Sequence, residues 1–115
     1  MAQSALIASD AAQSLVLADA AHVSPSGVVS RTLVHTPDLR AVLFSFDAGQ
    51  ELSAHTNRRR ALVMILSGAC DFQFANKWQR LEAGAFLHLP PNHPHAVRAS
   101  HGPFSMLLTL GAENA

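Results

Sequence analysis

Two stretches of this 115-residue chain combine histidines with glycine-bounded, alternating apolar sequence, and chemistry is expected there. Residues 49–68 read GQELSAHTNRRRALVMILSG, and residues 84–95 read GAFLHLPPNHPH. Alternation at every second residue is typical of β-strands, so the histidines would lie where one strand faces another. Imidazole nitrogens bind iron, manganese, nickel and zinc, so these stretches could contribute to a divalent metal site.

The first stretch resembles the first signature motif of the cupin superfamily, a group of small β-barrels. Gly49, His55 and Gly68 fall on the spacing of that motif. Asn57 stands where the family has a second histidine, and Ala61 stands where it has a glutamate. The resemblance therefore retains one of the three ligand positions of this motif.

The second stretch is similar to the second cupin motif. Gly84, Pro90 and His95 match it, whereas Asn92 replaces a glycine and Ala99 replaces the closing asparagine. The resemblance covers roughly the last two thirds of the chain, and it locates a fold better than it identifies an activity. It implies an all-β, double-stranded β-helix (jelly-roll) barrel.

In the family, three histidines and one glutamate hold a divalent ion with open positions for substrate or oxygen. The resemblance carries over His55 and His95. His93 shares the face of His95 if the segment is extended, whereas the intervening Pro94 favours a turn. The predicted metal ligands are thus His55, His93 and His95, for Fe, Mn, Ni or Zn. The alternative is that no metal binds, and that these side chains bond to each other, to Asn57 or to water.

Neighbouring polar residues are predicted to bind a small anionic ligand, namely Asn57, Arg58 and Arg60. A guanidinium donates two parallel hydrogen bonds to a carboxylate or phosphate at the mouth of a barrel. The alternative is that the arginine run is a solvated corner. His88 alternates with apolar residues that belong in the core, so it is expected to point outward.

The composition limits the class of protein. Apolar residues make up 49% of the chain and charged residues only 14%, whereas about 25% charged is typical of soluble proteins. The formal net charge is zero, so no overall field attracts nucleic acid or an acidic membrane. No apolar run is long enough to span a bilayer, no basic segment opens a signal peptide, and Cys70 is a single cysteine. These features predict a cytoplasmic protein.

The hydrophobic pattern predicts one domain of about nine short strands, which is typical of a sandwich or barrel. Residues 1–26 are predicted to form an N-terminal arm, and residues 27–115 a cupin barrel domain. Within the arm, residues 11–20 could form a short helix capped by Ser9 and Asp10, or an extended segment. The expected strands are 28–35, 40–46, 52–55, 61–66, 69–74, 78–81, 85–89, 96–100 and 104–110.

Strand parity predicts which side chains line the barrel. If His55 points inward, Ser53 and Asn57 do so too. Cys70 alternates with Phe72, so a buried, inert thiol is expected. The inward residues of the following strand are then Ala61, Val63 and Ile65.

The outward residues of that strand are equally apolar, namely Leu62, Met64 and Leu66. A strand that is apolar on both faces needs cover on both faces. A second copy of the chain would supply that cover in a homodimer. The alternative cover is the N-terminal arm or a second sheet of the same chain.

The sequence thus predicts a single-domain cupin of unassigned activity that binds a divalent metal, a small anionic molecule, or both. One alternative is a metal-dependent dioxygenase or isomerase acting on a small anionic substrate. Another is a non-catalytic sensory or structural module whose barrel is filled by side chains. Whether the chain is an enzyme is left open.

Overall fold

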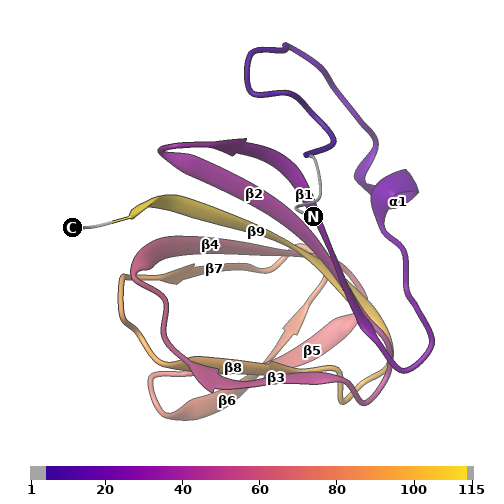
Figure 1. The fold of residues 1–115 in the computed structure, drawn as a ribbon. Coiled ribbons are helices and arrows are strands. Elements are labelled where there is room, and N and C mark those ends of the chain that lie inside the picture. The colour runs from indigo at the N-terminus through magenta and orange to yellow at the C-terminus, as the bar shows by residue number, and fades with distance from the viewer. Residues whose placement is uncertain (1–4, 114–115) are drawn as a thin grey trace.

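The computed structural model describes residues 5–113, which form two antiparallel sheets that face each other (Figure 1). The strands are β1 Val28–Thr36, β2 Leu39–Phe46, β3 Glu51–His55, β4 Arg59–Ser67, β5 Ala69–Phe74, β6 Lys77–Glu82, β7 Phe86–Leu89, β8 His95–Arg98 and β9 Phe104–Glu113. The five-stranded sheet has the order β1-β2-β9-β4-β7, and the four-stranded sheet has the order β3-β8-β5-β6. The predicted all-β jelly-roll architecture is confirmed.

The core lies between the two sheets and is built from alternate residues of their strands. Ala61, Val63 and Ile65 of β4 are buried there, as predicted. Cys70 is also buried, and this burial, with a smaller effect of the Asp71 carboxylate, raises its pKa to about 12. The thiol is therefore protonated at neutral pH and is not a nucleophile.

The N-terminal segment is an extended arm, and its helix, α1, spans only Leu17–Ala20. Of the two alternatives for residues 11–20, the structure therefore shows the extended segment, with a helix only in the last turn. The arm instead bonds to the edge of β1, because the N–H groups of Leu6 and Ile7 donate to the carbonyls of Thr32 and Leu33 at 3.0 and 2.7 Å. An isolated helix of ten residues is only marginally stable in water. The contacts with β1 therefore decide the conformation of the N-terminal arm.

The arm covers one half of the outer face of the five-stranded sheet (Figure 1). Ala20 of α1 is buried there against Leu33 of β1 and Leu43 of β2. Leu66 and Leu107 pack against the same cluster. The arm thus supplies the predicted cover for one of the three outward residues of β4. Across residues 5–113, no helix is long and apolar enough to cross a membrane.

The other half of this face stays open and apolar. Leu62, Met64 and Phe86 are 38%, 44% and 61% exposed and lie on the neighbouring strands β4 and β7. We propose that a second copy of the chain covers them, because exposed apolar side chains on adjacent strands form a contiguous patch of the kind found at interfaces.

Light scattering at micromolar concentration tests this homodimer. The expected mass is twice that of the 12.3 kDa chain. Replacing Met64 and Phe86 by Glu should shift the mass to that of the monomer, because unpaired charges would be buried at the contact. The control Leu39→Glu, which changes an exposed leucine outside the patch, should remain dimeric. A wild-type mass near 12.3 kDa would refute the dimer.

The motif glycines take backbone conformations that other residues rarely adopt. Gly68 and Gly84 have φ of 72° and 92°, in the left-handed region. Asn92, which replaces a motif glycine, has φ of 64°, and asparagine is among the residues that tolerate this conformation best. At Gly68 a Cβ would also collide with the carbonyl oxygen of Pro103, whereas at Gly84 it would meet open space.

These two glycines form a matched pair for mutation. Gly84→Ala should lower the free energy of unfolding by about 1 kcal/mol, because it adds only backbone strain. Gly68→Ala should cost about 1–3 kcal/mol more, because the turn must also move away from Pro103. Urea denaturation measures both variants. Equal losses would show that the close approach at Gly68 has no energetic consequence.

Candidate functional site

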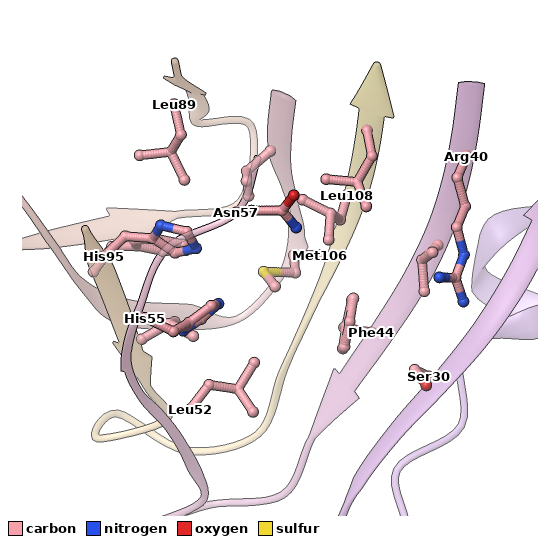
Figure 2. A pocket seen from close by; sticks show the side chains of 15 residues that line it. Ser30, Arg40, Phe44, Leu52, His55, Asn57, Leu89, His95, Met106 and Leu108 are labelled. Atoms are coloured by element: carbon pink, nitrogen blue, oxygen red, sulfur yellow. The ribbon is translucent and has the colours of Figure 1, made fainter. Parts of the chain in front are cut away.

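A cavity of about 230 Å³ opens between the two sheets (Figure 2). Most of its wall is apolar, and its polar side chains come from β1, β2, β3, β8 and the segment between β3 and β4. The residues that line it are Ser30, Arg40, Val42, Phe44, Leu52, His55, Asn57, Val63, Phe72, Leu89, His95, Val97, Met106, Leu108 and Leu110. This cavity brings together three of the predicted site residues, His55, Asn57 and His95.

His55 and His95 meet because β3 and β8 are antiparallel neighbours in which these two residues are directly paired. Their ring centroids are 4.3 Å apart. A β-bulge lies between Leu52 and His55, so both of these side chains line the cavity although they are three residues apart. The prediction that Ser53 points inward with His55 is therefore wrong, since the extra residue reverses the parity.

Both imidazoles are oriented in the same way by the backbone. Nδ1 of His55 donates to the Ser53 carbonyl at 2.8 Å, and Nδ1 of His95 donates to the His93 carbonyl at 2.9 Å. A carbonyl oxygen only accepts, so Nδ1 carries the proton of the neutral ring and Nε2 is an acceptor. Burial lowers the pKa of His95 below its usual value, which keeps that ring neutral near pH 7.

Asn57 presents a donor to the cavity. Its Oδ1 accepts the backbone N–H of Arg59 at 2.8 Å, so the carboxamide oxygen is occupied and the NH₂ group remains. The backbone carbonyl of Asn57 accepts the N–H of Asn92 at 2.7 Å, which ties this segment to the loop before β8. Figure 2 shows the Asn57 side chain next to Met106, on the same side of the cavity as the histidine pair. The site therefore offers acceptors from two rings and donors from one amide.

His93 is not part of the cavity wall. Its Nε2 accepts the backbone N–H of Ala75 at 3.3 Å. Ala75 and Asn76 are the central residues of the β5–β6 turn, with φ of 52° and 62°. His93 thus holds this turn, and the structure does not bring it to His55 and His95. His93 and Pro94 precede β8, which begins at His95.

The predicted arginines also lie outside the cavity wall. Arg60 points to the outer face of β4, where Nη1 donates to Nε2 of His88 at 2.8 Å. His88 is exposed on that face, as predicted from its parity. Arg58 is exposed and does not line the cavity. The arginine that does line the cavity is Arg40, at the start of β2.

The sequence did not point to Arg40 because this residue lies outside both histidine-containing stretches. Arg40 pairs with Leu110 of β9, which lines the cavity, so the two side chains share the inner face. The register of β2 against β9 would have identified it, and that register comes from the tertiary structure.

The donor set does not match a tight metal centre. The described part of the chain contains no group of three or more His, Cys, Asp or Glu residues that could hold an ion. His55 and His95 supply two nitrogens, and Asn57 contributes a donor, whereas tight divalent sites use three or four protein ligands. The oriented Nε2 atoms resemble metal-ligating histidines in their backbone support, yet the third ligand is missing.

Elemental analysis of protein purified without chelator or nickel resin tests this assignment. We expect iron, manganese, nickel and zinc each well below one equivalent per chain, and weak binding of added zinc by calorimetry. His95→Ala should abolish the zinc signal, whereas the control His88→Ala should leave it unchanged. Stoichiometric metal that survives dialysis against a chelator would show that a third ligand exists.

The similarity to known proteins agrees with this geometry. A family model described as a cupin domain matches residues 42–110, which is more than half of the chain. The chain belongs to the cupin family. Among curated proteins, none matches this chain.

Solved structures give the same family and varied functions. A conserved protein of unknown function from Streptococcus pyogenes is 32% identical, with a TM-score of 0.81 over 100% of both chains. A cupin superfamily protein from Desulfitobacterium hafniense is 26% identical, with a TM-score of 0.81 over 88% of this chain and 92% of that one. The DMSP lyase DddQ from Ruegeria pomeroyi is 25% identical, with a TM-score of 0.70 over 76% of this chain and 49% of that one.

Proposed function

We propose that this cupin binds a small organic ligand in its barrel cavity and recognises a polar group of that ligand through His55, His95 and Asn57. The observation that carries the proposal is the pair of oriented Nε2 acceptors beside an amide donor, at one place in an apolar wall. Apolar cavities with a few convergent polar groups are the usual form of ligand sites.

The size and polarity of the cavity limit the ligand. At about 230 Å³ it is smaller than the roughly 300–1,000 Å³ of sites for drug-sized molecules. The Nε2 atoms accept hydrogen bonds, so the ligand presents a hydroxyl or another donor to them. The Asn57 amide donates in return, so a hydroxyl oxygen or a carbonyl beside that donor would be satisfied as well.

The cavity favours ligand binding over the two alternative functions. A structural module with a filled barrel does not account for an open cavity with oriented polar groups. A metal-dependent dioxygenase or isomerase needs a metal centre, for which two nitrogens are too few. The lyase activity in the name of the Ruegeria protein belongs to that protein, whose chain this one covers by half. Ligand binding is the function that the residues support directly.

Two-dimensional NMR with a panel of short diols and hydroxy acids tests the proposal. We expect binding compounds to shift the ring signals of His55 and His95, and His95→Gln to weaken the binding about tenfold because one acceptor is lost. The control His88→Gln, on the outer face, should leave the affinity unchanged. A panel that shifts only outer-face histidines, or no cavity residue at all, would contradict the proposal.

The pH dependence of ligand affinity and of stability provides a second test. The folded pKa of His95 lies below its usual value near 6.5, chiefly because the ring is buried and to a smaller extent because of the charges of His55 and His93. The Nε2 acceptor is therefore present above that lowered pKa and is lost as the pH falls through it, so affinity should fall there. Stability should also decline from about pH 6.5 downward, because the unfolded chain takes up the proton first. His95→Gln should flatten both profiles.

A further inference from the structure

The cavity has a second polar region, formed by β1 and β2 on the side away from the histidine pair (Figure 2). Arg40 and Ser30 line this region. In Figure 2 they are separated from His55 and His95 by Phe44, Met106 and Leu108. The cavity is therefore polar at two places and apolar between them.

Strand register explains why hydroxyl groups gather beside Arg40. Ser30 pairs with Phe44 and Thr32 pairs with Val42, and both partners line the cavity, so the two hydroxyls lie on the inner face of β1. Nη2 of Arg40 donates to Oγ1 of Thr32 at 3.3 Å. Because Thr32 accepts this bond, its own hydroxyl proton remains available to another acceptor.

The charge of this region is uncompensated by the cavity wall. The residues that line the cavity include Arg40 and no aspartate or glutamate. The guanidinium of Arg40 is a cation that matches a carboxylate with two parallel donors. The Ser30 and Thr32 hydroxyls add further donors on the same side. Together these groups can donate hydrogen bonds to both oxygens of a carboxylate.

The two polar regions differ in what they accept. The histidine pair presents lone pairs, which repel an anion and attract a donor such as a hydroxyl. The Arg40 region presents only donors and a positive charge. A molecule with one carboxylate and one hydroxyl at opposite ends satisfies both, whereas a second carboxylate would face the Nε2 lone pairs.

We infer that Arg40, with Ser30 and Thr32, forms an anion subsite, and that the ligand of this cupin is a small amphipathic hydroxy-monocarboxylic acid. Its carboxylate lies at Arg40, its apolar body against Phe44, Met106 and Leu108, and its hydroxyl at the histidine pair. This inference rests on the proposed function of the cavity and adds the charge and the polarity of the ligand.

Three probes of equal chain length test the inference by NMR titration: ω-hydroxyhexanoate, hexanediol and adipate. Wild-type protein should bind ω-hydroxyhexanoate about tenfold tighter than hexanediol, because a charged, bidentate hydrogen bond replaces a neutral one. Adipate should bind more weakly than ω-hydroxyhexanoate, since its second carboxylate meets the two Nε2 acceptors. Backbone signals of residues 30–32 and 40 should shift with the acid and not with the diol.

Arg40→Gln is expected to remove the tenfold preference for the acid and to leave the affinity for hexanediol unchanged. Arg40→Lys should restore part of the preference, because it returns the charge without the planar pair of donors. Arg31→Gln is the matched control, since Arg31 lies on β1 between Ser30 and Thr32 but pairs with Leu43, whose side chain packs under the arm on the outer face. This variant should behave as wild type.

The outcomes separate the inference from the proposed function. If Arg40→Gln keeps the tenfold preference, the anion subsite is overturned while binding of hexanediol at the histidine pair still supports the proposed function. If adipate binds as tightly as ω-hydroxyhexanoate, the assignment of a monocarboxylic acid is overturned. If no probe shifts the cavity residues of the wild type, both the subsite and the proposed function fail.

Discussion

The antiparallel pairing of β3 with β8 is the interaction on which the site depends. It places His55 opposite His95, and the bulge after Leu52 turns His55 into the cavity. The carbonyls that accept the Nδ1 protons belong to Ser53 of β3 and to His93, two residues before β8 begins. The backbone therefore sets the position of both rings through the strand pairing and their tautomer through the two carbonyls.

The remaining strands hold the two sheets apart at a distance that leaves a cavity beside the histidine pair. Side chains from both sheets fill the core beside it, and stacked rings of Phe46 and Phe104, 4.5 Å between centroids, close one region of the interior. Glycines in left-handed conformations allow the sharp turns between strands, and at Gly68 the turn packs directly against Pro103. The cavity is thus a gap within a packed interior rather than a loosely folded region.

The contrast between the two ends of the cavity gives this cupin its chemical character. Lone pairs face inward at the histidines, and donors with a positive charge face inward at Arg40. The family motif places chemistry at the histidine end alone. Here Ala61 and Asn57 stand where the family has a glutamate and a histidine, and Arg40 of β2 places a guanidinium at the other end.

Much of the fold followed from the sequence, because alternation, β-branched runs and turn residues are local signals with a period of two. All nine predicted strands are present, and the buried parity of Ala61, Val63 and Ile65 was readable from the chain. The conformation of residues 11–20 was not, because these residues are used to cover a sheet that is distant in sequence. His55 and His95 were found through their motif positions.

Only the tertiary structure decided which polar residues share the cavity with the histidines. A single bulge turned Ser53 away from the face that His55 occupies, and a bulge leaves no mark in the residue types around it. His93 accepts a hydrogen bond from the β5–β6 turn, and Arg60 bonds to His88 on the outer face. The register of β2 against β9 places Arg40 at the cavity. Each of these outcomes depends on pairing between strands far apart in the chain, whereas the sequence by itself determines the strands and their two faces.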